Sequence, residues 1–180
     1  MDVTEFNEMS DRAAEALIRP CAAIDSFVDA LLAARPYADL ATLLATAEAQ
    51  AATWTMAEVD SALADHPRIG ESLSREGSRE SSSTDSSERA PAAASVAMSS
   101  SEQSGVDLTD EDLAARLRRG NRAYEERFGR IYLVRAAGRS TAELVEILEQ
   151  RLGNDPVTES SVTAAQLGEI ALLRLRGIFS

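Results

Sequence analysis

The sequence predicts an all-α protein, folded as a single-domain bundle of about seven or eight helices with a long flexible Ser-rich insertion. Apolar residues recur three or four positions apart over most of the chain, as they do on one face of a helix. Helix-capping residues, prolines and glycines stand where these runs begin and end. Only residues 131–134 form an apolar run typical of a strand, and one short strand cannot form a sheet.

The N-terminal half of the chain is expected to form four helices. The first ends at Pro20, the second ends before Arg35-Pro36, and Asp39 caps the third. The apolar faces of these three helices are Phe6, Met9, Ala13 and Leu17; Ile24, Phe27, Val28, Leu31 and Leu32; and Leu40, Leu43, Leu44 and Ala47.

The fourth expected helix leads to the only histidine of the chain. Thr55 and Glu58 form a capping box at its start. The helix must stop near His66, because the residue before a proline is pushed out of the α region. A helix C-terminus favours a protonated imidazole, so His66 is a candidate catalytic acid or base. The alternative is that His66 merely helps to end the helix.

Residues 71–101 break the helical pattern. They contain serine runs, scattered charges and no apolar period. Such a composition cannot bury enough apolar area to offset the entropy lost on ordering. We therefore expect residues 73 to about 97 to be a flexible surface insertion within the single domain 1–180. This insertion is either a tolerated surface loop or a segment that is phosphorylated or acts as a lid.

The C-terminal half is expected to form three more helices. The first opens at residues 109–112 and closes at Gly129, which can adopt the left-handed conformation common at helix ends. A capping box of Ser140 and Glu143 opens the second. Pro156 is suited to the first position of the last helix.

The charge balance excludes several classes of partner. The chain has 180 residues, with 18 Lys+Arg, 30 Asp+Glu and a formal net charge of −12. A nucleic-acid binder needs a basic face, and an anionic membrane surface attracts basic segments, so neither partner is expected. No apolar run approaches the ~20 residues of a membrane span, and the acidic N-terminus does not resemble a signal peptide. The expected location is the cytoplasm.

The rarest residues exclude several kinds of chemistry. Every basic residue of the chain is an arginine, so no lysine is present to form a Schiff base or a P-loop. Cys21 is the only cysteine, which excludes an intrachain disulfide and a site with several thiolates. We expect Cys21 to be a buried, unreactive thiol rather than a nucleophile.

Several segments, taken in order, resemble the signatures of the OHCU decarboxylase family. His66-Pro67-Arg68-Ile69-Gly70-Glu71 is similar to the family pattern His-Pro-x-Ile-Gly-Asp. Further matches are Ser99-x-x-Glu102-Gln103 with Gly105, Asn121-x-x-Tyr124-x-x-x-Phe128-Gly129, Arg151-Leu152-x-Asn154 and Leu173-Arg174-Leu175. The resemblance covers nearly the whole chain outside the Ser-rich insertion. Arg130 departs from it, because an aromatic residue is common at this position of the family.

The resemblance implies an activity and a fold. The family is all-helical and commonly dimeric, and it needs neither a metal nor an organic cofactor. Its reaction converts 2-oxo-4-hydroxy-4-carboxy-5-ureidoimidazoline to (S)-allantoin with loss of CO₂, in the degradation of urate. The implied partners are therefore a small anionic substrate and a second copy of the chain.

The resemblance also implies roles for individual residues. His66 and Glu102 would form the catalytic acid/base pair. The resemblance does not assign which of the two delivers the stereospecific proton. Arg174 would bind the anionic end of the substrate, unless it is simply an exposed residue of the last helix. Residues expected to bind the substrate or shape its pocket are Pro67, Ser99, Gln103, Gly129 and Ile131. Residues expected to support the structure around them are Arg68, Asn121 and Arg151.

A different class of function fits the same composition. The chain could be a non-catalytic helical interaction module, with an acidic surface and a Ser-rich loop that recruits a partner. The enzyme hypothesis predicts that His66, Glu102 and Arg174 line one cleft. The module hypothesis predicts that His66 and Glu102 lie far apart.

Overall fold

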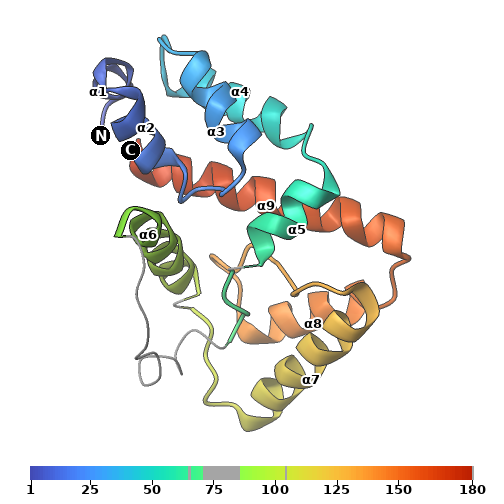
Figure 1. Ribbon diagram of the computed structural model, residues 1–180. Coiled ribbons are helices and arrows are strands. Elements are labelled where there is room, and N and C mark those ends of the chain that lie inside the picture. Colours follow the sequence, from blue (N-terminus) through green and yellow to red (C-terminus); the bar gives the residue numbers. More distant parts are fainter. Residues whose placement is uncertain (65, 71–85, 104, 180) are drawn as a thin grey trace. The chain divides into compact units, whose positions relative to one another are not determined.

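A computed structural model describes residues 1–64, 66–70, 86–103 and 105–179, with the backbone alone for 86–93. All regular structure in these ranges is helical, which confirms the all-α class (Figure 1). The helices in this part of the chain are α1 Val3–Glu8, α2 Asp11–Ile18, α3 Asp25–Ala33, α4 Leu40–Ala51, α5 Met56–Leu63, α6 Ser86–Glu102, α7 Glu111–Phe128, α8 Thr141–Arg151 and α9 Pro156–Ile178.

The chain divides into two compact units. One unit combines Met1–Ala62 with Ala164–Ser180, and the other is Leu63–Thr163. Helix α9 begins in the second unit and ends in the first. The expectation of a single domain over 1–180 stays a prediction.

The first unit joins the two ends of the chain. The amino group of Met1 donates to the carbonyl of Ile178 at 3.1 Å, and the ends lie side by side in Figure 1. The Phe6 ring packs edge-on against Phe179, with centroids 5.2 Å apart. The side-chain amide of Asn7 pairs with the backbone of Tyr37 through two hydrogen bonds of 2.8 Å. The first two contacts anchor the N-terminal segment to the end of α9, and the bonds of Asn7 anchor it to the segment between α3 and α4.

The first predicted helix is wrong, because the structure divides it into α1 and α2. Met9 adopts an extended conformation, and Ser10 becomes the N-cap of α2 with its Oγ 3.4 Å from the amide of Ala13. Arg35 donates to the carbonyls of Phe6 and Met9 at 3.0 and 2.8 Å. The serine cap and the arginine thus satisfy backbone groups that a continuous helix would pair internally.

The second unit is built on the packing of α7 against α8. Both helices contribute to a buried cluster that includes Leu117, Tyr124, Leu144 and Leu148. Gly120 permits the close approach of the helices, because a Cβ at this position would overlap the side chain of Leu148. The apolar run 131–134 pairs with no strand in the described chain, and its residues Tyr132 and Val134 are buried in the same cluster.

The local signals for helix ends are confirmed. Thr55 with Glu58, and Ser140 with Glu143, form the expected reciprocal hydrogen bonds. Gly129 ends α7 with a left-handed φ of 70°, a conformation that glycine adopts without steric cost. Pro156 is the first residue of α9.

The Ser-rich segment requires a correction. Residues 73–85 of the expected loop lie outside the described residues. Residues 86–97 belong to α6, so the prediction of a loop there is wrong. The segment 90–97 is rich in alanine, which has the highest helix propensity. The prediction rested on the serine content and therefore overlooked this run of strong helix formers.

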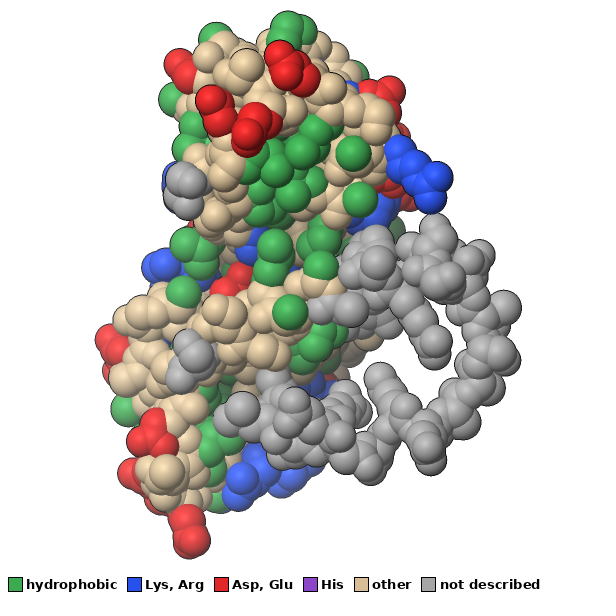
Figure 2. All heavy atoms as spheres, turned by 90° about the vertical axis from the view of Figure 1, so that its left-hand side faces the viewer, with side chains coloured by type: hydrophobic (Ala, Val, Ile, Leu, Met, Phe, Trp, Pro, Cys, Tyr) green, Lys and Arg blue, Asp and Glu red, His purple; other side chains and the backbone are tan. Residues whose placement is uncertain are grey.

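The described surface carries charges of both signs. Figure 2 shows acidic and basic side chains exposed on one face of the molecule. Within the described ranges, none of the helices combines the length and hydropathy of a membrane span.

Candidate active site

His66 lies on a tight turn at the start of the second unit. After α5, the backbone amide of His66 donates to the carbonyl of Leu63 at 3.0 Å. The side chains of His66 and Pro67 are half-buried. The turn ends at Gly70, whose φ of 82° strains any residue with a side chain. A Cβ there would also lie 3.0 Å from the Leu117 side chain, so the motif needs glycine for both conformation and space.

Three consecutive residues of this turn are tied to other elements. Arg68 donates from Nε and Nη2 to the two carboxylate oxygens of Glu125, at 2.5 and 2.9 Å. The carbonyl of Ile69 accepts from Asn121 Nδ2 at 3.2 Å. The amide of Gly70 donates to Gln103 Oε1, also at 3.2 Å. Helix α7 and the end of α6 together therefore hold the His66 turn.

The end of α6 carries three of the predicted site residues. Ser99 is buried, and Glu102 and Gln103 are half-buried. The amide of Gln103 donates to the carbonyl of Ser99 at 3.0 Å, which continues the helical pattern past Glu102. Because Gln103 also bonds Gly70, the structure brings the two signature segments around His66 and Glu102 together.

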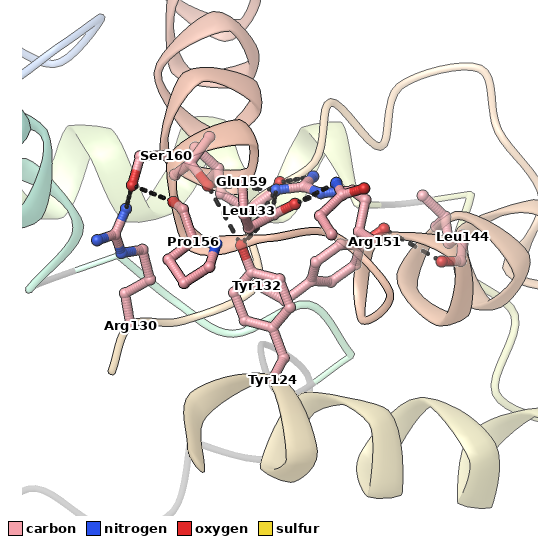
Figure 3. A network of polar contacts seen from close by, with 11 residues as sticks. Tyr124, Arg130, Tyr132, Leu133, Leu144, Arg151, Pro156, Glu159 and Ser160 are labelled. Carbon is pink, nitrogen blue, oxygen red and sulfur yellow. Dashed lines mark hydrogen bonds and ion pairs between the residues drawn. The ribbon is translucent and has the colours of Figure 1, made fainter. Parts of the chain in front are cut away.

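The predicted pocket residues 129–131 adjoin a buried polar network (Figure 3). Arg151 donates from Nε and Nη2 to one oxygen of Glu159, at 2.8 and 2.5 Å. Its Nη1 donates to the carbonyl of Leu133 at 2.6 Å. The hydroxyl of Tyr124 donates to the same Glu159 oxygen, and Asn154 donates to the other at 2.7 Å. The network thereby ties the non-helical segment after Gly129 to α8 and α9.

Hydrogen bonds keep the acid of this network ionised. Burial raises the pKa of Glu159, but the bonds from Arg151, Tyr124 and Asn154 outweigh it and hold that pKa below its usual range. Burial and the bond to Glu159 raise the pKa of Tyr124. A charged pair held by several hydrogen bonds makes this network a rigid support for the neighbouring segment.

The flank of the network shows how Arg130 is placed. Its Nη1 donates to Ser160 Oγ at 3.3 Å, and the Arg130 side chain is half-buried (Figure 3). Gly129 is exposed and Ile131 is half-buried. The residue that departs from the family pattern is thus held by Ser160 near the start of α9.

Arg174 belongs to the other unit and is buried. The whole residue is only 5% exposed, and its Nη1 donates to the carbonyl of Pro20 at 2.9 Å. Its neighbour Arg176 is exposed. The alternative that Arg174 is simply an exposed residue is therefore wrong. Cys21 is also buried in this unit, as expected.

The described residues offer no ready metal site. Within the ranges given above, no three His, Cys, Asp or Glu side chains are grouped to hold an ion.

Comparison with known proteins decides the family. The sequence model of the OHCU decarboxylase family matches residues 7–176, which is nearly the whole chain. The chain belongs to the OHCU decarboxylase family. Within the family, it is 37% identical over 76 residues to 2-oxo-4-hydroxy-4-carboxy-5-ureidoimidazoline decarboxylase of Amia calva. It is 35% identical over 81 residues to the uric acid degradation bifunctional protein TTL of Arabidopsis thaliana.

These two alignments are partial. They cover 42% of this chain and 43% of the Amia calva protein, and 44% of this chain and 25% of the Arabidopsis thaliana protein. The aligned part of this OHCU decarboxylase family member thus spans less than half the length of either curated relative.

Solved structures confirm the fold of the family member. A crystal structure of OHCU decarboxylase in the presence of (S)-allantoin matches with a TM-score of 0.66 at 21% identity, over 91% of this chain and 97% of that chain. A crystal structure of (S)-allantoin synthase matches with a TM-score of 0.68 at 15% identity, over 100% of this chain and 54% of that chain.

Sequence reasoning missed two acids of the second unit. Glu125 was not singled out, although it follows Asn121 by four positions and therefore shares its helix face. Glu159 was not singled out either, although Asn154 of the family motif bonds it. Arg68 is 57 positions from Glu125, and Tyr124 is 35 positions from Glu159, so no local pattern identifies these pairs. Arg151 and Asn154 lie only 8 and 5 positions before Glu159, but they meet it across the turn between α8 and α9.

Proposed function

We propose that this protein decarboxylates 2-oxo-4-hydroxy-4-carboxy-5-ureidoimidazoline to (S)-allantoin and CO₂. The observation that carries the proposal is the bond between Gln103 and Gly70, which joins the segment of Glu102 to the turn of His66. Membership of the family over residues 7–176 supports the same activity. The names of the curated relatives agree with a role in the degradation of urate.

The proposed reaction uses the substrate as its own electron sink. The carboxylate stands on a carbon next to a C=N bond. As CO₂ leaves, the C–C bond breaks and its electron pair moves into the imine. The decarboxylated carbon and the former imine carbon become joined by a C=C bond as the C=N pair moves onto nitrogen. A proton then adds to the former imine carbon from one face, which sets the configuration of the product, while the hydroxyl on the decarboxylated carbon loses its proton and becomes a C=O group. The protein has to position the substrate, stabilise the developing anion and deliver that proton, so the reaction as proposed requires no cofactor.

The proposed catalytic residues are His66 and Glu102. An imidazole beside a carboxylate can be held in one tautomer and can exchange a proton at neutral pH. Arg174 is the proposed ligand of the substrate's anionic end, because a guanidinium binds a carboxylate through two parallel hydrogen bonds. The proposed residues for binding the ring and shaping the pocket are Pro67, Ser99, Gln103, Gly129 and Ile131.

The activity is tested by circular dichroism. Urate oxidase and hydroxyisourate hydrolase generate the unstable substrate from urate in the cuvette. Spontaneous decay gives racemic allantoin, which has no optical signal. The wild-type protein is expected to speed the decay and to produce the signal of one enantiomer. If added protein does neither, the proposed activity fails, and the helical interaction module becomes the better hypothesis.

We also propose that the protein acts as a homodimer, as the family resemblance suggests, and that it is located in the cytoplasm. Light scattering coupled to size-exclusion chromatography should give twice the 19.3 kDa mass of one chain. A mass of one chain over the working concentration range contradicts the dimer.

A further inference from the structure

We propose that Arg68 and Glu125 are positioning residues for His66, and that their ion pair latches the His66 turn onto α7. The inference rests on the proposed function for its catalytic consequence. Arg68 occupies the variable position of His-Pro-x-Ile-Gly, and Glu125 occupies a variable position between Tyr124 and Phe128.

The geometry of the pair restricts the turn. Both bonds run from one edge of the guanidinium to the two oxygens of one carboxylate, at 2.5 and 2.9 Å. Such a bidentate pair fixes orientation as well as distance. Arg68 stands two residues after His66, and the ring of the intervening Pro67 fixes its own φ. Little backbone freedom thus separates the ion pair from the imidazole.

Helix α7 provides a rigid base for this latch. Asn121 and Glu125 lie four residues apart on one face, and they hold the carbonyl of Ile69 and the side chain of Arg68. The bond between Asn121 and Ile69 holds the turn one residue further along the chain from His66 than the ion pair of Arg68 does. The ion pair is therefore nearer to His66 along the chain than the other of these two contacts with α7.

A second ion pair of α7 provides a matched control. Arg116 donates to both carboxylate oxygens of Glu149 on α8, at 3.1 and 2.8 Å. The side chains of this pair are 37% and 48% exposed, against 36% and 30% for Arg68 and Glu125. Both pairs are bidentate and half-exposed, but Arg116–Glu149 joins α7 to α8 rather than to the His66 turn. A purely stabilising role predicts the same behaviour for both.

The kinetic test compares E125Q with E149Q. Glutamine keeps the shape of each side chain and removes its charge. We expect E125Q to lower kcat about tenfold, because a small misplacement of a catalytic group slows the chemical step. The KM of E125Q should stay within about twofold of wild type, and E149Q should keep both constants within that range. Equal kcat values for the two variants contradict the latch.

A double-mutant cycle tests whether the two residues act as one unit. R68M and R68M/E125Q should each lose about as much kcat as E125Q, because either single change already breaks the pair. Losses that multiply in the double variant contradict a shared role.

A readout without substrate separates the latch from the proposed function. The amide of Gly70 lies in the same turn, so its hydrogen exchange reports how firmly the turn is held. We expect E125Q to speed this exchange about tenfold relative to wild type and E149Q to leave it unchanged. If wild type lacks turnover, the proposed function fails, while the exchange rates still decide the latch. Equal exchange in E125Q and E149Q contradicts it.

Discussion

Arg151 and Glu159 form a buried ion pair, and a substitution of one residue can measure what the pair contributes to the free energy of unfolding. Their side chains are 7% and 1% exposed. In E159Q, the cation of Arg151 stays buried without its counter-charge, which costs about 3 kcal/mol in the free energy of unfolding. Urea denaturation at pH 7 measures the loss. The exposed residue Glu146 provides the control, and E146Q should change stability by less than about 0.5 kcal/mol. Similar losses in both variants contradict the account.

The same residue predicts how stability depends on pH. Because the pKa of Glu159 is lowered in the folded state, its contribution is complete above the unfolded value of about 4.3 and disappears as pH falls through the folded value. The stability difference between wild type and E159Q should therefore shrink as the pH is lowered from 7 toward 3. Unfolding curves at a series of pH values measure it, and a difference that grows in acid contradicts the assignment.

Individual residues also show where sequence reasoning stops. Ser140 and Glu143 were paired correctly because their bonds span three positions and follow from local chemistry. Arg68 and Glu125 are 57 positions apart, and their pairing appears only when α7 packs beside the His66 turn. The sequence thus predicts Arg68 as a supporting residue but not its partner Glu125.

At the scale of elements, the packing of α7 against α8 depends on Gly120. Alanine is the better helix former, so G120A would stabilise an isolated helix. In the protein, the added methyl group would meet Leu148, including its Cγ at 3.0 Å, and overpacking costs about 1–3 kcal/mol. We therefore expect G120A to lower the melting temperature.

Gly177 of α9 is the matched control for that substitution. It is also helical, but a Cβ there meets no atom within 4 Å. G177A should leave the melting temperature unchanged or raise it. If thermal melts show no difference between G120A and G177A, close helix packing does not limit this position.

Two elements show why periodicity alone misplaces boundaries. The apolar period continues from Phe6 through Met9 to Ala13, yet the cap at Ser10 divides this stretch into α1 and α2. In α2 the break also shifts the buried face, because Ala13 is exposed while Ala14 and Ile18 are buried. In α6, alanines that favour a helix are interspersed with the serines on which the loop prediction rested. In both cases the backbone follows caps and propensities that the apolar pattern does not record.

At the scale of the whole molecule, the net charge of −12 constrains the proposed function. The proposed substrate is an anion, so an acidic protein has to bind it through local groups against its mean field. The chain has no lysine, which leaves arginines and the single histidine for this task. The turn of His66 meets the end of α6 through Gln103, and Arg174 is buried in the other unit. This distribution makes His66 the most informative residue to change.

The most direct test is the optical signal of the allantoin formed by wild type and by H66A. Wild type should produce one enantiomer faster than the spontaneous racemic decay. H66A should be at least ~100-fold slower, the lower range for loss of a general acid or base, while E146Q should match wild type. An H66A protein that forms the same enantiomer at the wild-type rate would contradict the site proposed around His66. A wild-type protein that yields only racemic allantoin at the spontaneous rate would contradict the decarboxylase itself.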